Sequence, residues 1–263
     1  MAKTKIEWTE YSWNPVTGCT KISPGCANCY AERFARRLAG RCGYPKDDAF
    51  RVTLHPDKIG EPLKWRQPRR IFVSSMGDLF HEQVPDEFIA RIWWVMGQCA
   101  GYLDPSRYRG HTFMILTKRP ERMKEWLEGW AEQETRKRWI ESLGEVYDWM
   151  NGPRYWPDVL ENVWLGVTAE DQVRADERIP ILLQIPAAVH WISCEPLLGP
   201  IDLSGWLEFT WACPECGDMS GFVGEWCPCG KGVYVEQPRL RWVVAGGETG
   251  PGARPMHPDW VRS

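Results

Sequence analysis

The 263-residue sequence lacks an uninterrupted apolar stretch long enough to span a lipid bilayer. Residues 1–8 carry two lysines but no apolar run behind them, so a secretory signal is not expected. Internal repeats and low-complexity tracts are also missing, which excludes solenoid and other repeat architectures. These absences predict a folded cytoplasmic protein that has no membrane partner.

The sequence has little excess charge of either sign. It contains 32 basic and 35 acidic residues, for a net charge of −3. Such a balance creates no global field that attracts a polyanion, so any binding of nucleic acid depends on a local patch. With 43% hydrophobic and 25% charged residues the composition is ordinary for a folded chain, and the length allows one large domain with a small insert.

Ten cysteines are present, but disulfides are not expected. The chain is long enough to bury its own core, and seven of the cysteines fall into two tight clusters. In a reducing compartment, clustered cysteines bind metal more often than they form disulfides. Cys42, Cys99 and Cys194 stand alone and are predicted to be core or incidental thiols. Most of the 17 tryptophans are predicted to fill the core.

Short apolar runs recur along the chain, each followed by polar residues and then by a helix-like stretch. Such runs are typical of parallel strands that are buried on both faces. They predict strands at residues 71–74, 112–117, 163–168, 189–193 and 242–245, with a first strand within 6–16. Helical spacing predicts helices that begin near residues 30, 85 and 119. In the first of these, Tyr30, Phe34 and Leu38 form a stripe predicted to face the core.

The alternation of strand and helix predicts an α/β fold of about six βα units. Two segments interrupt it: residues 128–160, which predict an extended helical connection, and residues 205–238, which predict a small inserted metal-binding knuckle. The predicted domains are therefore a barrel-like body, 1–204 and 239–263, and the insert, 205–238. Asp259 occupies an N-cap position for a helix that the sequence does not continue, as in a chain that lacks its last βα unit.

Cys19, Cys26 and Cys29 have the spacing C-x6-C-x2-C. Three thiolates from one loop suit a [4Fe–4S] cluster whose fourth iron stays open to an exogenous ligand. They equally suit a zinc ion with a fourth ligand from elsewhere, and three unrelated buried thiols are a third interpretation. The loop follows the predicted first strand, so it lies at the carboxyl ends of the strands, where βα-repeat folds carry their chemistry. This position favours the open cluster.

Seven segments carry a resemblance to a known family: WNPVTGC (13–19), CANCY (26–30), SSMGDLFH (74–81), LTKRP (116–120), GVTAE (166–170), SCEP (193–196) and GGETGPG (246–252). The sequence resembles radical S-adenosylmethionine (SAM) enzymes, and more closely a phage-associated three-cysteine-motif family of uncharacterised proteins grouped near them. It departs from the usual loop in its longer first gap. Asn28 also stands where an aromatic residue usually precedes the last cysteine, although Tyr30 follows, as in spore-photoproduct-lyase-like members.

The resemblance implies a partial (β/α)6 barrel, similar to part of a TIM barrel, in which a [4Fe–4S] cluster binds SAM. An electron donor would supply one electron, SAM would be cleaved to a 5′-deoxyadenosyl radical, and this radical would abstract a hydrogen atom from the substrate. The substrate is not identified by the sequence. A nucleotide or nucleic acid in a phage setting is one candidate.

The resemblance also implies roles for polar residues at the strand ends. Ser74, Ser75, Gly77 and Asp78 occupy the segment that holds the SAM ammonium group in related enzymes. Thr168 and Glu170 lie where the ribose hydroxyls would sit. The next two strands end in further candidates for SAM binding, namely Ser193, Glu195, Gly246, Gly247 and Glu248. Each of these residues has the alternative interpretation of an N-cap or turn residue.

Two cations and two histidines flank the same strand ends. Lys118 and Arg119 are candidates to hold a carboxylate or phosphate of the substrate, with surface cations as the alternative interpretation. His81 and His257 are predicted to be structural, hydrogen-bonded histidines.

Cys213, Cys216, Cys227 and Cys229 have the spacing C-x2-C-x10-C-x-C. Four thiolates from two tight turns suit a closed, tetrahedral zinc site with a structural role, and an auxiliary iron–sulfur cluster is the alternative. A ribbon of this kind can also contact substrate or nucleic acid, but Lys231 is the one cation close to it in the sequence.

Three functions compete on this reading. The first is a radical SAM enzyme of unknown substrate. The second is a non-catalytic zinc or iron–sulfur module that serves a partner protein. The third is DNA-lesion repair of the photoproduct-lyase kind, which the pair Cys29–Tyr30 suggests and the acidic net charge disfavours.

Overall fold

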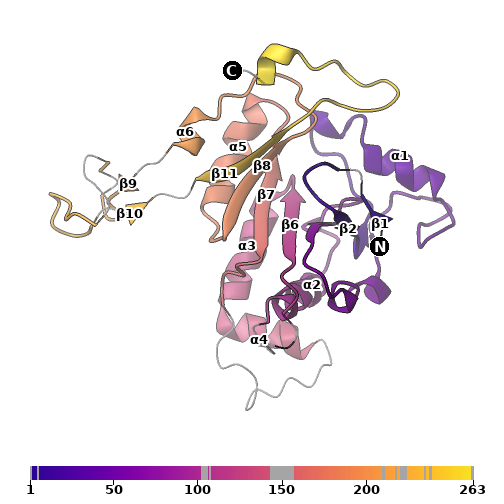
Figure 1. The fold of residues 1–263 in the computed structure, drawn as a ribbon, viewed down its shortest axis with the longest axis horizontal. Coiled ribbons are helices and arrows are strands. Elements are labelled where there is room, and N and C mark those ends of the chain that lie inside the picture. The colour runs from indigo at the N-terminus through magenta and orange to yellow at the C-terminus, as the bar shows by residue number, and fades with distance from the viewer. Residues whose placement is uncertain are drawn as a thin grey trace.

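A computed structural model describes residues 2–4, 6–101, 106, 108–142, 157–208, 211–216, 218–219, 224–233, 235–236 and 239–261. A seven-stranded sheet forms its centre (Figure 1), in the order β1-β2-β5-β6-β7-β8-β11. Its strands are β1 (Ala2–Lys3), β2 (Tyr11–Trp13), β5 (Arg70–Val73), β6 (Thr112–Thr117), β7 (Val163–Thr168), β8 (Val189–Cys194) and β11 (Leu240–Ala245). Each predicted strand is present, within a few residues of its predicted ends.

All neighbours in the sheet pair in parallel except β1 and β2, which are antiparallel. The six parallel strands follow one another in chain order, so each connection is a crossover to the adjacent strand. This arrangement confirms the α/β class. Within the described residues β1 and β11 are the two edges of the sheet, and closure into a barrel is not seen.

Helices fill the connections between the parallel strands. They are α1 (Tyr30–Arg37), α2 (Asp86–Cys99), α3 (Pro120–Ala131), α4 (Gln133–Glu141), α5 (Gln172–Leu183) and α6 (Ser204–Leu207). Short 3-10 turns occur at Pro24–Cys26, Pro56–Lys58, Pro62–Lys64 and Pro258–Val261. The last turn begins at Pro258, so Asp259 lies inside it and does not cap it. No helix among the described residues has the length and apolar character needed to cross a membrane.

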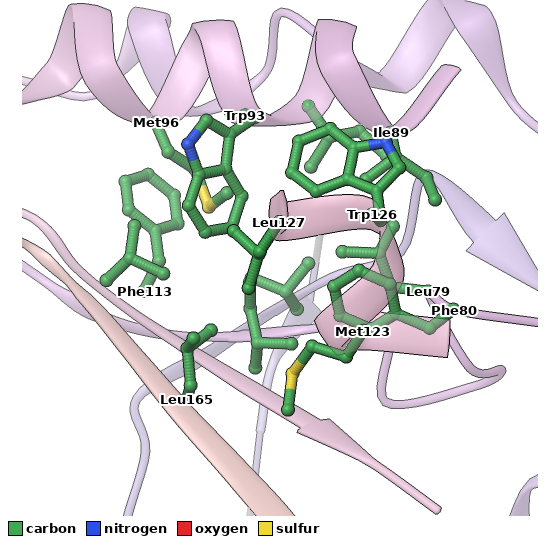
Figure 2. Close-up of a cluster of buried hydrophobic side chains, with 14 of the residues drawn as sticks. Leu79, Phe80, Ile89, Trp93, Met96, Phe113, Met123, Trp126, Leu127 and Leu165 are labelled. Atoms are coloured by element: carbon green, nitrogen blue, oxygen red, sulfur yellow. The ribbon is translucent and has the colours of Figure 1, made fainter. Parts of the chain in front are cut away.

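Alternate residues of the strands form the main core against α2, α3 and α5. In Figure 2, Trp93 and Met96 of α2 and Met123 and Leu127 of α3 converge on side chains that include Phe113 of β6. Tryptophan rings connect the helices at this core: Trp126 stacks on Trp139 of α4, with centroids 5.3 Å apart. The expectation that tryptophans fill the core holds for this cluster.

The intervening residues of the strands form a second apolar cluster on the opposite face of the sheet. It contains Trp8, Phe72, Met114 and Trp191, all buried. Trp191 lies against Gly166 of the neighbouring strand, where an added Cβ would stand 2.5 Å from the indole ring. Gly166 is therefore needed so that the ring can lie flat on β7. Aromatic side chains occupy the middle of this face, and polar residues follow at the carboxyl ends of the strands.

Helix α1 differs from its prediction. Ala31 and Ala35 are its buried residues, whereas Tyr30 is 40% exposed and Phe34 is 51% exposed. The predicted apolar stripe through Tyr30 and Phe34 is therefore wrong, because the helix buries Ala31 and Ala35, while Tyr30 reaches the body only through its hydroxyl, which donates to the Ser75 carbonyl. A short antiparallel pair, β3 (Val16–Thr17) and β4 (Thr53–Leu54), also has no counterpart in the predicted elements.

The cysteine-rich insert forms a hairpin of β9 (Trp211–Ala212) and β10 (Val235–Glu236). It stands away from the sheet, at the left of Figure 1. Of the predicted long connection 128–160, the end of α3 and all of α4 are helical, and residues 143–156 lie outside the described residues. The structure therefore contains a sheet-based body and a separate cysteine hairpin, and the predicted boundaries at 205 and 238 stay a prediction.

Candidate metal-binding sites

The first cysteine loop (residues 18–29) lies across the carboxyl ends of the parallel strands. It enters beside β5, where Gly18 forms a bridge with Gly77 and its N–H donates to the Met76 carbonyl at 2.9 Å. Gly18 has a φ of +84°, and a Cβ there would stand 2.2 Å from the Arg51 carbonyl oxygen. The close crossing of three backbone segments explains why glycine precedes the first cysteine.

Arg119, directly after β6, holds the start of this loop. Its Nη1 donates to Cys19 Sγ at 3.4 Å, and its Nη2 donates to Thr20 Oγ1 at 2.8 Å. Its Nε donates to Glu82 at 2.9 Å, and the guanidinium is almost fully buried. Predicted as a substrate contact, Arg119 has its N–H groups turned to the loop and its neighbours, so it acts here as a positioning residue for Cys19.

Asp78 links the ends of β5 and β6. One carboxylate oxygen accepts from Thr117 Oγ1 at 2.7 Å and from the Phe80 N–H at 3.0 Å. The other accepts from the Lys118 N–H at 3.2 Å and pairs with Arg119 at 3.3 Å. These contacts favour the interpretation of Asp78 as a turn acid, and its predicted contact with the SAM ammonium group stays a prediction.

Glu170, after β7, holds the middle of the loop. The side chain is fully buried, and it accepts from the Gly25 N–H at 3.0 Å and from Arg178 at 3.1 Å. A Cβ on Gly25 would stand 3.0 Å from the carboxyl carbon, so only glycine fits without displacement. Burial acts to raise the pKa of Glu170, but hydrogen bonds from Ser23 and Gly25 and the charge of Arg178 hold that pKa below its usual value.

Glu248, after β11, holds the end of the loop. It accepts from Asn28 Nδ2 at 2.8 Å and from both sides of the Arg254 guanidinium, at 2.6 and 3.0 Å. Arg254 also donates to the Pro24 carbonyl at 3.0 Å. Hydrogen bonds from Arg254 lower the pKa of Glu248 to about 2. Asn28 thus ties the loop to the segment that follows the last strand.

The other predicted contacts lie along the same strand ends. Glu195 accepts from Ser193 Oγ at 3.4 Å and from Trp8 Nε1 at 3.3 Å, and it lies against Gly246. Ser75 donates to Asn14 at 3.1 Å. Ser74 is buried with a φ of +58°, and its Oγ has no hydrogen-bond partner among the described residues. A strained residue with a spare hydroxyl is a feature of ligand sites.

Three further predicted residues complete the site. Thr168 is buried, and its carbonyl accepts from Arg178 at 2.8 Å. Gly247 lies against Met256, which an added Cβ would approach to 3.4 Å. His81 is fully buried, and its Nε2 lies 3.0 Å from Thr20 Oγ1, as expected for a structural, hydrogen-bonded histidine.

The thiols of the loop lie in different electrostatic surroundings. Burial and the charge of Asp78 raise the pKa of Cys19 to about 11, against the opposing effect of Arg119. Burial acts in the same direction on Cys26, but hydrogen bonds from Ile22 and Ser23 and the charge of Lys118 leave its pKa lower than usual. Lys118 therefore lies near the thiol loop, and its predicted contact with a substrate stays a prediction. A hollow of about 300 Å³, lined in part by Cys19, Lys21 and Arg51, opens beside the loop.

The second cysteine cluster is built differently. Its four sulfurs lie within 4.8 Å of one another, with Cys213 and Cys229 3.7 Å apart and Cys216 and Cys227 3.5 Å apart. Four thiolates around a tetrahedral zinc stand about 3.8 Å apart, since each Zn–S bond is about 2.3 Å. The Cys229 N–H points at Cys227 Sγ at 3.5 Å, as in a turn that wraps a metal. This group could hold a metal ion such as zinc.

The sulfurs of the first loop are not gathered in this way. Among the described residues, the second cluster is the group whose metal-ligating atoms all lie within 4.8 Å, so Cys19, Cys26 and Cys29 are spread more widely. In a cubane each cysteine binds a different iron, and its thiolates stand further apart than those around one ion. As placed, the three sulfurs therefore do not surround a single metal ion in the way that the second cluster does.

Sequence reasoning missed several residues of this site. Thr20, Asn28, Glu82, Arg178 and Arg254 all hold the loop or its anchors. Their spacing from the cysteines carries no signal, because the contacts join segments as much as 230 residues apart.

Comparison with known proteins gives one match. A family model described as "Protein of unknown function (DUF5131)" matches residues 3–263. No curated protein and no solved structure matches the chain.

Proposed function

We propose that this chain, which belongs to the DUF5131 family of proteins of unknown function, is a radical SAM enzyme. In this proposal Cys19, Cys26 and Cys29 hold a [4Fe–4S] cluster with one open iron, and the body is a partial (β/α)6 barrel. The observation that carries the proposal is the position of the cysteine loop. Arg119, Glu170 and Glu248, from the ends of three strands, all hold it over the carboxyl edge of the sheet.

The anchors are of the kind that an open metal site needs. Three cysteines cannot close a tetrahedral site, so the protein must fix the loop by contacts other than metal bonds. Glu170 and Arg119 are almost fully buried, and each bonds to loop atoms beside a cysteine. Burying a charged side chain costs free energy unless the charge is fully paired. The use of such costly groups to hold this loop supports a functional role for it. The thiols of the loop do not gather within 4.8 Å as those of the second cluster do, which disfavours a single zinc ion at this position.

The cluster with SAM would supply a 5′-deoxyadenosyl radical after one electron arrives from a donor. The contribution of the chain's own residues is binding and the exclusion of water. In this proposal the hydroxyl of Ser74 and the inner strand ends at Thr168, Ser193 and Glu195 hold the polar groups of a ligand, which the unpartnered Ser74 hydroxyl supports. The aromatic cluster of Trp8, Phe72 and Trp191 forms an apolar floor beneath them, which keeps water away from a reactive species.

We further propose that the second cysteine cluster binds zinc in a structural role. The separation of its sulfurs matches that around a tetrahedral ion, and its ligands come in two tight turns of one hairpin. With four protein ligands it would have no open position. A zinc or iron–sulfur module without catalysis, and a lyase for DNA photoproducts, are the alternatives that the experiment below separates.

The test is anaerobic purification followed by reduction in the presence of SAM. The expected result is a brown protein with about four irons and one zinc per chain, which releases 5′-deoxyadenosine. A colourless protein with zinc at both sites supports the binding module. Release of 5′-deoxyadenosine only with pyrimidine-dimer DNA supports the repair enzyme. A cluster that forms but never cleaves SAM contradicts the proposed catalysis.

A further inference from the structure

Helix α1 begins directly after Cys29 and leaves its large side chains uncovered. Tyr30 and Phe34 lie one turn apart; Phe34 is 51% exposed, and Tyr30 leaves its ring 40% exposed while its hydroxyl donates to the Ser75 carbonyl. Arg37 follows on the face of Phe34, with its guanidinium 5.6 Å from the Phe34 ring centroid. Exposed aromatic rings at this spacing are unusual on a surface helix, which normally buries such residues. This face of α1 is therefore a candidate surface for contact with a partner.

The charge around this face is opposite to that of the whole protein. Residues 30–46 contain one acid, Glu32, and a group of cations, Arg33, Arg36, Arg37, Arg41 and Lys46. The segment thus has a local net charge of +4 in a chain whose net charge is −3. Glu32 already pairs with Arg36 at 2.6 Å and with Lys21 at 3.1 Å. A polyanion is the partner that this segment attracts.

We propose that the exposed face of α1 binds single-stranded nucleic acid and leads it to the first cysteine loop. Tyr30 and Phe34 stack on unpaired bases, and Arg37 and Arg41 contact the phosphates. Since the helix starts at Cys29, a strand that follows this face ends at the loop. The inference deepens the proposed function by naming its substrate class, and it rests on that function for the chemistry that follows binding.

Two features favour a single strand over other partners. The bases of a duplex are already stacked on each other and offer no free faces to aromatic side chains, whereas those of a single strand do. An acidic protein segment would satisfy the cations but gives no use for two exposed rings in line with them. The cysteine hairpin is a poorer candidate for a nucleic-acid surface, because residues 211–236 contain the acids Glu215, Asp218, Glu225 and Glu236 and one cation, Lys231.

The experiment measures fluorescence anisotropy of a labelled oligonucleotide of about 20 thymidines with the full chain, purified anaerobically. Phe34→Ala is expected to weaken binding about tenfold, because one stacked base is lost. Arg37→Ala with Arg41→Ala is expected to weaken binding and to reduce the slope of log K against log salt by about 1.4, since two phosphate contacts are lost. The matched control is Lys137→Ala with Arg138→Ala on α4, at the far end of the body, which should leave binding unchanged.

Phe34→Trp keeps the stacking ring and is expected to bind as the wild type does. All variants change exposed side chains, and a thermal unfolding curve checks that each remains folded. Four results overturn the inference: no binding by the wild type, equal loss in the α4 control, tighter binding of a duplex of equal length, or an unchanged affinity in Phe34→Ala. An unchanged affinity in Phe34→Ala would mean that the cations alone attract any polyanion or an acidic protein, without base stacking.

The binding measurement needs neither iron nor SAM. If the chain binds the oligonucleotide but holds no cluster, the result contradicts the proposed chemistry and still supports nucleic-acid binding by α1. A chain that holds a cluster and cleaves SAM, but does not bind the oligonucleotide, defeats the inference alone.

Discussion

The two cysteine clusters of this chain are built on opposite principles. The second gathers its four sulfurs within 4.8 Å by the turns of a single hairpin. The first spreads three cysteines along a loop that Arg119, Glu170 and Glu248 hold from three different strands. One site is complete in itself, and the other depends on the sheet.

This difference follows from the number of thiols. Four thiolates can close a tetrahedral site, so metal bonds can fix the hairpin without outside help. Three thiolates leave a position open, and the fold must supply the rigidity that the missing bond would give. Substitutions in the sheet should therefore affect the first site and spare the second.

Exchange of one ligand in each cluster gives the largest effect. Cys26→Ser is expected to remove the iron, about four atoms per chain, and to leave about one zinc. Cys227→Ser is expected to remove the zinc and leave the iron. Metal analysis of the purified variants measures both. Loss of both metals from either variant would show that the clusters are coupled, against the separation described above.

Glu170→Ala should destabilise the body strongly. It leaves Arg178 buried without its carboxylate and the Gly25 N–H without its acceptor, at a cost of about 3–5 kcal/mol. The control is Glu177→Ala on α5, whose exposed pair with Arg174 should contribute no more than about 1 kcal/mol. Urea unfolding measures both variants. Equal losses would mean that Glu170 is not an anchor, and the zinc content should be unchanged in both.

Arg119→Lys tests whether the fork of the guanidinium positions Cys19. Lysine keeps the charge near Asp78 but cannot reach Cys19, Thr20 and Glu82 together, so iron affinity should fall by about 10- to 100-fold. Arg122→Lys, on the same helix and paired with Asp86, is the matched control. Iron retained against a chelator is the readout. If the two variants lose iron equally, the contact with Cys19 has no positioning role.

Glu248→Gln should have the smallest effect and a defined pH dependence. The pKa of Glu248 lies at about 2 in the folded protein, below its usual value of 4.5, so its ionised form adds stability above pH 4.5. The wild type should exceed the variant by about 1 kcal/mol at neutral pH. That advantage should be lost as the pH falls from about 4.5 to about 2. A difference that is constant over this range would argue against the ion pair with Arg254.

The comparison also shows what sequence can and cannot predict here. Near-continuous apolar runs predicted five of the six parallel strands, and the first was expected within residues 6–16. The spacing of Cys213, Cys216, Cys227 and Cys229 predicted sulfurs that lie together. Both signals are local. The anchors Glu170 and Glu248 were recognised as strand-end acids, but their partners Gly25 and Asn28 were not, because those contacts join residues 145 and 220 positions apart.

The prediction of which face of α1 is buried was wrong for a related reason. Periodicity marked Tyr30 and Phe34 as one stripe, but it does not say which stripe meets the body when small residues, Ala31 and Ala35, offer another. The close approach that selects the alanines depends on the tertiary structure around the helix, which no window of sequence contains.

The most direct test of the account is electron paramagnetic resonance of the reduced, anaerobically purified protein, with and without SAM. The account predicts the signal of a reduced [4Fe–4S] cluster that changes when SAM is added, since SAM binds the open iron. The Cys227→Ser variant should give the same signal and the same change. A signal that does not change when SAM is added would contradict the proposed open cluster. So would the absence of an iron signal in a folded chain that carries zinc at Cys19, Cys26 and Cys29.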